Sequence, residues 1–130
     1  MLKNNLYFIK KIATTSSSID AHVELSVQHA IFEGHFPGHP VLPGACMLQM
    51  VKELLETFLE KPLQLMKADD IRFSAMVDPN VNKELIFSIQ YHLTEAQLVN
   101  VNAKILKQDN TVCCKIKASF NNKTGSVSRD

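Results

Sequence analysis

Hydrophobic and polar residues alternate in several short segments of the chain, which is the pattern of half-buried β-strands. These segments are residues 22–31, 71–77, 85–91, 99–105 and 112–120. Residues typical of turns follow two of them, at 78–80 (DPN) and 108–110 (QDN). The last three segments are spaced for an antiparallel meander. Residues 6–13 are apolar with interspersed lysines and are expected to form the first strand.

Residues 45–60 follow a helical period instead. At about 100° per residue, apolar side chains fill half of the circumference, so this helix should be largely buried. The polar side of the helix carries Gln49, Lys52, Glu53, Glu56 and Glu60. We expect these charges to form a solvated face, and we expect Pro62 to end the helix.

One buried helix and one antiparallel sheet make an α+β arrangement. The chain has 130 residues, which suffices for a single domain with a core of its own. We place that domain at residues 1–120. Residues 121–130 contain a single apolar residue and are expected to form a flexible C-terminal tail.

Charge and composition narrow the classes of function. Lys plus Arg is 14 and Asp plus Glu is 13, a balance that argues against a broad surface for nucleic acid or an anionic membrane. No apolar run reaches the ~20 residues of a membrane-spanning helix. Cys46, Cys113 and Cys114 lack CxxC spacing and are expected to be reduced thiols in a cytoplasmic protein. No His, Cys, Asp and Glu grouping has metal-site spacing, so no metal and no cofactor is expected.

Six of the nine glycine and proline residues fall in residues 34–44, which read GHFPGHPVLPG. This stretch resembles the signature of the hotdog-fold 3-hydroxyacyl-(acyl-carrier-protein) dehydratases, in which it leads into the central helix. Residues 71–79 also resemble a strand and turn of that family, and the order of elements fits over about residues 5–120. The resemblance implies a hotdog fold, with one long central helix wrapped by a curved antiparallel sheet of five to six strands.

The resemblance also implies a catalytic site. The family's catalytic histidine corresponds to His35, whose imidazole can exchange protons near neutral pH. The family's oxyanion donor corresponds to the backbone N–H of Gly44, at the positive end of the helix dipole. The family's acidic partner, a Glu or Asp on the helix, is replaced here by Gln49, which has no proton to give near pH 7. Glu53, one turn further on, is a candidate for a displaced carboxylate.

By the same resemblance, the substrate would be an acyl thioester carried by acyl carrier protein or coenzyme A. Position along the chain suggests a lining for the acyl chain made of Phe36, Leu42, Pro43, Met47, Met50 and Phe73. The structural alternative is that these residues belong to the core. His22, His29, His39 and His92 are expected to be structural or loop residues.

Gln49 leaves three functions open. The first is dehydration of 3-hydroxyacyl thioesters in a fatty-acid or polyketide-like pathway. The second is a thioesterase, in which Gln49 would position a water. The third is a non-catalytic subunit that binds an acyl group or carrier, or that pairs with an active homologue supplying the acid. Because the family builds each site across a dimer interface, we expect a homodimer or a mixed dimer.

Overall fold

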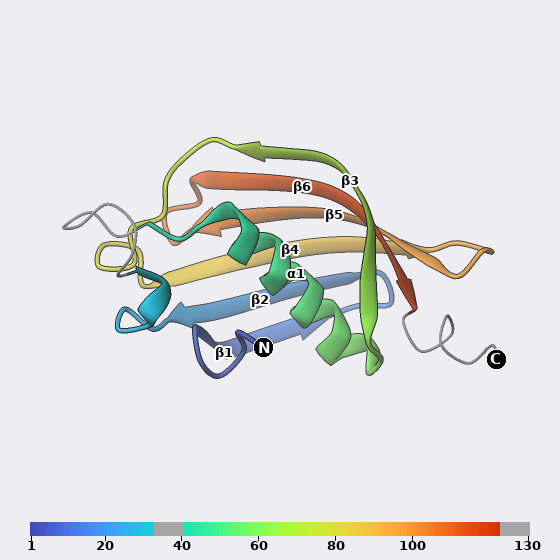
Figure 1. Ribbon diagram of the computed structural model, residues 1–130, viewed down its shortest axis with the longest axis horizontal. Helices are drawn as coiled ribbons and strands as arrows, with labels where there is room; N and C mark the ends of the chain where they lie inside the picture. The colour runs from blue at the N-terminus through green and yellow to red at the C-terminus, as the bar shows by residue number, and fades with distance from the viewer. Residues whose placement is uncertain (33–40, 123–130) are drawn as a thin grey trace.

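The computed structural model describes residues 1–32 and 41–122. It contains one long helix and six strands in a single sheet (Figure 1). The elements in chain order are β1 (Tyr7–Thr14), β2 (Ser18–Leu25), the short 3₁₀ turn η1 (Ala30–Phe32), α1 (Gly44–Leu59), β3 (Leu63–Phe73), β4 (Glu84–Leu93), β5 (Leu98–Lys107) and β6 (Val112–Asn122).

All strand pairs are antiparallel, and the order across the sheet is β1-β2-β4-β5-β6-β3. The sheet curves, and α1 lies across its inner face (Figure 1). The predicted hotdog arrangement is therefore confirmed, with six strands around one helix. The predicted meander is confirmed as β4, β5 and β6.

The core forms between the helix and the inner face of the sheet. Met50, Val51, Leu54 and Leu55 of α1 are fully buried, as the apolar half of the helix predicted. The helix ends at Leu59 because Glu60 adopts a left-handed conformation with φ of 57° and donates its N–H to the Glu56 carbonyl.

Two strand boundaries differ from the sequence prediction. The segment 22–31 was expected to be one strand, but β2 runs from Ser18 to Leu25. The chain then leaves the sheet, where Ser26 N–H bonds to the Leu6 carbonyl and residues 30–32 turn into η1. At the other end of the chain, β6 runs to Asn122, two residues past the predicted end of the domain. The rest of the predicted tail lies outside the described residues.

A third difference concerns β3. The alternation over 71–77 predicted a strand there, but β3 begins at Leu63 and ends at Phe73. It lies at the edge of the sheet, where most of its side chains are exposed on both faces. Its pairing with β6 is shifted between Leu65 and Lys67 and again between Ala68 and Asp70. Because both faces of β3 are exposed and two β-bulges shift its register, its sequence lacks the alternation of apolar and polar residues by which a half-buried strand is recognised.

Candidate functional site

A hollow of about 370 Å³ lies at the N-terminal end of α1. It collects four of the residues expected to line an acyl site together with the expected oxyanion donor: Leu42, Pro43, Gly44, Met47 and Phe73. Its remaining walls are Val41 and residues 74–76. The loop is fixed here by a 2.9 Å hydrogen bond from Leu42 N–H to the Val77 carbonyl.

Gly44 opens the helix at this hollow. Pro43 precedes it with extended backbone and makes no side-chain cap for the first turn. Within residues 1–32 and 41–122, the Gly44 N–H has no hydrogen-bond acceptor. An uncapped first turn leaves amide hydrogens and the positive end of the helix dipole free for negative charge. The geometry thus suits a group that develops an oxyanion.

Glycine is required at this position by the neighbouring strand. The ring of Phe73, at the end of β3, packs directly on Gly44, and a Cβ atom there would collide with the tip of that ring. The ring is about half exposed and closes one side of the hollow. A glycine at this position lets the ring lie directly on the backbone at the start of α1.

Met50 does not belong to this lining. It is fully buried in the core beneath α1 and does not border this hollow, so its place in an acyl lining stays a prediction. His35 and Phe36 lie outside the described residues. Their roles remain predictions.

Gln49 lies on another side of the helix. It borders a second hollow of about 240 Å³ between α1 and β3, together with Lys52 and Leu65. Gln49 and Gly44 are five residues apart, which places them about 140° apart around the helix. In the described part of one subunit, Gly44 and Gln49 thus border two different hollows.

Glu53 occupies an unexpected environment. The prediction that Glu53 lies on a solvated face is wrong, because the exposed fraction of this residue is 0%. Its carboxylate accepts four hydrogen bonds. The donors are Leu2 N–H at 2.9 Å, Lys3 N–H at 2.8 Å, the Tyr7 hydroxyl at 3.0 Å and Gln49 Nε2 at 2.8 Å. The N-terminal segment thus covers Glu53, while Lys52, Glu56 and Glu60 of the polar side keep access to solvent.

These donors determine the protonation of Glu53. Burial alone would raise its pKa, but the hydrogen bonds from Leu2, Gln49, Tyr7 and Lys3 outweigh burial and hold the pKa below its ordinary value. Burial and the neighbouring Glu53 charge raise the pKa of Tyr7. Glu53 is therefore an ionised acceptor near neutral pH, with both oxygens engaged by donors of the chain. This is a poor state for a proton donor.

The Glu53 contact also orients Gln49. Because Nε2 of Gln49 donates to Glu53 Oε2, the amide oxygen is turned away from Glu53. Sequence reasoning missed Tyr7 and the two backbone amides that fix this arrangement. In the sequence, a tyrosine at the start of a strand is only a weak sign of a partner for Glu53. Backbone donors some 50 residues away along the chain leave no sign in the sequence at all.

Comparison with known proteins now adds to this geometry. A family model for ApeI-like proteins, described as ApeI dehydratase, matches residues 11–117. The chain belongs to the ApeI-like dehydratase family.

Curated relatives of this ApeI-like chain are 3-hydroxyacyl-[acyl-carrier-protein] dehydratases named FabZ. The protein from Syntrophobacter fumaroxidans is 30% identical over 73 residues, which are 50% of each chain. The protein from Thermotoga neapolitana is 26% identical over 110 residues, 82% of this chain and 78% of the relative. The matched region thus spans between half and about four fifths of these two relatives.

Solved structures share the fold. The dehydratase heterocomplex ApeI:P from Xenorhabdus doucetiae superposes with a TM-score of 0.69 at 17% identity, covering 88% of this chain and 97% of that one. A hypothetical thioesterase with coenzyme A from Streptococcus pneumoniae gives 0.64 at 9% identity, covering 88% and 83%. The ApeI-like fold is thus common to proteins named as dehydratases and as thioesterases.

Two negative findings concern the described residues. No helix among them is long and apolar enough to cross a membrane. No cluster of three or more His, Cys, Asp or Glu side chains in the same part of the chain could hold a metal ion.

Proposed function

We propose that this ApeI-like protein acts on acyl thioesters and that its reaction is the dehydration of a 3-hydroxyacyl group. The observation that carries the proposal is the uncapped Gly44 N–H, which opens α1 inside a largely apolar hollow beside Phe73. A thioester oxygen placed there would gain stabilisation as it becomes negative. The apolar walls suit the acyl chain.

In the proposed reaction, His35 removes a proton from C2 of the substrate. The electron pair forms the C2–C3 double bond, the C3–O bond breaks, and the departing hydroxyl takes the proton now held by the His35 imidazolium and leaves as water. The net change moves one proton from C2 to the departing hydroxyl. Gln49 would hold that hydroxyl through its amide oxygen, since its amide nitrogen is engaged by Glu53.

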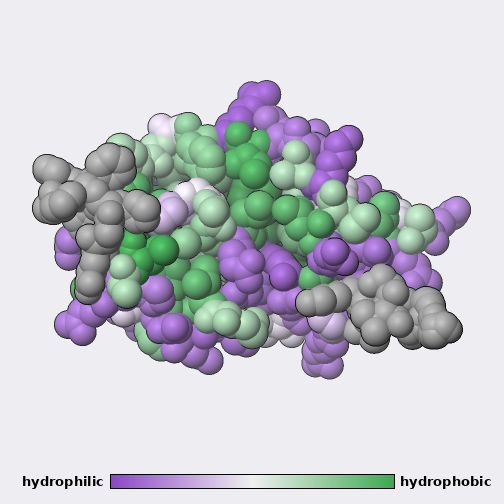
Figure 2. All heavy atoms as spheres, viewed as in Figure 1, coloured by the Kyte–Doolittle hydropathy of each residue, from purple (hydrophilic) through white to green (hydrophobic). Residues whose placement is uncertain are grey.

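We infer that a complete site needs two subunits. Gly44 and Gln49 border different hollows of one chain. Among residues 1–32 and 41–122, no strand pairs with the outer edge of β3, and β3 exposes Leu65, Met66 and Phe73. Figure 2 shows hydrophobic residues gathered on the molecular face that carries α1. An unpaired edge with exposed apolar side chains favours pairing with another chain.

The second subunit could be a copy of this chain or a homologue. The name of the ApeI:P heterocomplex describes two different dehydratase chains, and this supports a mixed dimer as an alternative to a homodimer. In a mixed dimer the partner would supply the carboxylic acid that Gln49 replaces. Without such a partner, this chain would be a binding subunit.

One observation favours a thioesterase as the second candidate. Gln49 borders the hollow beside α1, and its amide oxygen, turned away from Glu53, is an acceptor without a proton to give. Such an acceptor can orient a water for attack on a thioester carbonyl. The fold is compatible, because solved thioesterases share it.

Purified protein should be incubated with 3-hydroxyacyl thioesters of several chain lengths, on coenzyme A and on acyl carrier protein. Enoyl product and free thiol are measured in the same reaction. We expect enoyl product that is lost in His35→Ala and kept in His39→Ala, the matched histidine of the same loop. Free thiol with an unchanged acyl chain would establish the thioesterase instead. No product, alone or mixed with a hotdog homologue, would contradict catalysis.

A further inference from the structure

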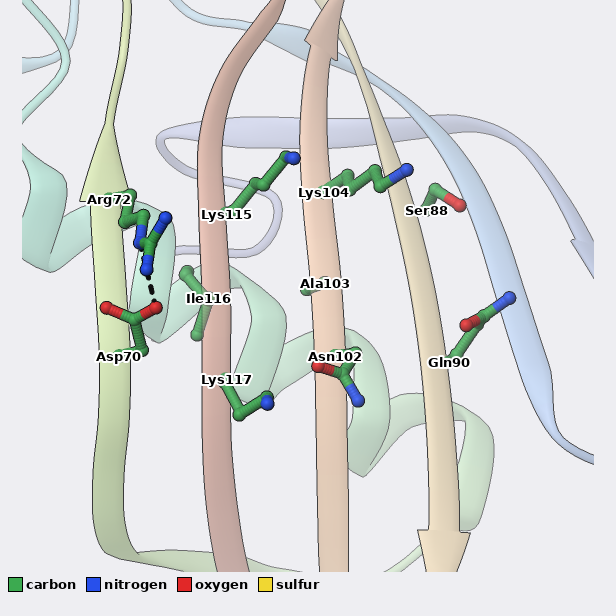
Figure 3. Close-up of a pocket in the computed structure, with 10 residues that line it drawn as sticks. All are labelled: Asp70, Arg72, Ser88, Gln90, Asn102, Ala103, Lys104, Lys115, Ile116 and Lys117. Atoms are coloured by element: carbon green, nitrogen blue, oxygen red, sulfur yellow. Dashed lines mark hydrogen bonds and ion pairs between the residues drawn. The ribbon is translucent and has the colours of Figure 1, made fainter.

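The outer face of the sheet, opposite α1, carries a positively charged groove of about 270 Å³ (Figure 3). It crosses β3, β6, β5 and β4, and its lining includes Arg72, Lys104, Lys115 and Lys117. This face takes no part in the proposed thioester site, which lies at the start of α1.

Strand register brings three of these cations into one row. Arg72 of β3 lies opposite Lys115 of β6, and Lys115 lies opposite Lys104 of β5. Neighbouring strands are about 4.8 Å apart. Like charges placed directly opposite each other destabilise a sheet, so this row has an energetic cost in the free protein. A ligand of opposite charge would relieve that cost.

The groove has little negative charge of its own. Asp70 is engaged by Arg72, with 2.9 Å between Oδ2 and Nε, and lies opposite Lys117 in the register. Lys104, Lys115 and Lys117 form no ion pair within the described part of the chain. The next carboxylate along the row is Asp20, which lies beyond Ser88 on β2.

The walls narrow the class of ligand. The lining contains no aromatic ring on which a nucleic-acid base could stack, and its apolar residues are only Ala103 and Ile116. The backbone of these strands is engaged in the sheet and offers no loop of free amides to a compact phosphate. What remains are cationic side chains with the amides of Gln90 and Asn102 beside them, as Figure 3 shows. This set suits several separate carboxylates.

The spacing of the row suggests how those carboxylates are presented. Residues four apart on an α-helix are about 6 Å apart, and the helical pitch is 5.4 Å, close to the separation of neighbouring strands. An acidic helix laid across the strands would place successive carboxylates over Lys104, Lys115 and Arg72. We propose that this groove docks an acidic amphipathic helix of a partner protein. The proposal goes beyond the thioester reaction and does not depend on it.

The test uses the full chain and a fluorescent alanine-based helical peptide with Glu at i, i+4 and i+8. The control peptide has the same composition with its Glu residues spread around the helix. Binding should be lost in the double variant Lys104→Thr, Lys115→Thr. It should be kept in two controls, the single variant Lys11→Thr and the double variant Lys10→Thr, Lys11→Thr. Those control lysines lie on β1, at the opposite edge of the sheet. Exposed ion pairs are screened, so affinity should fall roughly fivefold or more on going from low salt to about 0.15 M.

Backbone amide shifts of the unmodified protein give a readout that needs no variant. The striped peptide should shift resonances of residues 72, 104 and 115 and leave those of β1 unchanged. Equal binding of the two peptides, equal loss in the β1 variants, or no binding would overturn the proposal. Tighter saturable binding of inorganic pyrophosphate, or of phosphatidylserine vesicles, at the same residues would overturn it in favour of a phosphate or membrane ligand.

Discussion

At the scale of single residues, the contact between Gln49 and Glu53 decides how the missing acid should be restored. In Gln49→Glu, a second carboxyl group would stand where Nε2 now lies 2.8 Å from Glu53 Oε2. Two carboxylates this close cannot both be ionised, so the introduced group should hold a proton near neutral pH, with a raised pKa. We expect faster formation of enoyl product, with a pH profile of kcat/KM that falls on the alkaline side.

The matched control is Gln64→Glu, which adds a carboxylate to the same hollow away from Glu53. It should leave the rate and the profile unchanged. A Gln49→Glu protein that is no faster than Gln64→Glu, in the presence of every tested carrier, would contradict the orienting role of Gln49.

Gly44 allows a second test at this scale. In Gly44→Ala, the added Cβ collides with the Phe73 ring and pushes it from the start of α1. The backbone N–H of residue 44 is kept in this variant, but the collision displaces it relative to the hollow. Removing a well-placed oxyanion donor outright typically costs about 10²–10³ in rate, so for displacement we expect a smaller loss of roughly tenfold in kcat. The double variant Gly44→Ala, Phe73→Leu should recover most of it, because a smaller side chain frees the space. Failure to recover, with an unchanged melting temperature, would show that Phe73 is not the obstacle.

At the scale of elements, sequence periodicity identifies those that bury one face in the core, and it misses most of the exposed edge strand β3. Helix 45–60 was predicted within a residue at each end because its apolar half meets the core. The strands β4, β5 and β6 were predicted because one face of each is buried. The first eight residues of β3 were missed because an exposed, bulged edge strand carries no alternation. Glu53 was assigned to a solvated face because helical angle alone does not reveal the N-terminal segment that covers it.

The exposed edge of β3 leads to a prediction about assembly. Light scattering should give twice the 14.6 kDa of the chain, or a mixed dimer with a homologue. Leu65→Lys should shift the equilibrium to monomer, because a buried charge without a partner opposes association. The control is Ile12→Lys on β1, at the other edge, where the exposed fraction is 41% against 39% for Leu65. Equal effects of the two variants would remove β3 as the interface.

At the scale of the whole molecule, the even charge count conceals an uneven distribution. A net charge of +1 argues against a broad electrostatic surface and leaves a small local patch open, and three cations do align across β3, β6 and β5. Arg72, Lys104 and Lys115 are dispersed in the sequence, and only the strand register brings them together. Composition therefore limits the total charge and leaves its placement open.

The buried Glu53 carboxylate should make global stability depend on pH. Its pKa is lowered in the folded chain, so its contribution is present above the unfolded value of about 4.3 and is lost as pH falls through the folded value. Tyr7→Phe removes one of its donors and should lower the free energy of unfolding by about 1–3 kcal/mol at pH 7. The gap to the unmodified protein should narrow in acid.

Denaturant titrations from neutral to acidic pH measure this effect. The matched control is Tyr91→Phe, since Tyr91 is also a buried tyrosine but contacts Phe58 through its ring. The free energy of unfolding of Tyr91→Phe should differ from that of the unmodified protein by the same amount at every pH. If the difference in the free energy of unfolding between Tyr7→Phe and the unmodified protein were the same at every pH, the Tyr7 hydroxyl would not act through the charge of Glu53.

The attachment of the first residues to Glu53 has a consequence for hydrogen exchange. Amides at the ends of a chain usually exchange quickly, because nothing there needs to open. The N–H groups of Leu2 and Lys3 instead point into a buried carboxylate on the central helix. We expect their exchange to be slow and to accelerate in Glu53→Gln, while the Asp109–Asn110 turn exchanges rapidly in both proteins. Exchange of these two amides would then report the opening of the helix face on which Gln49 lies.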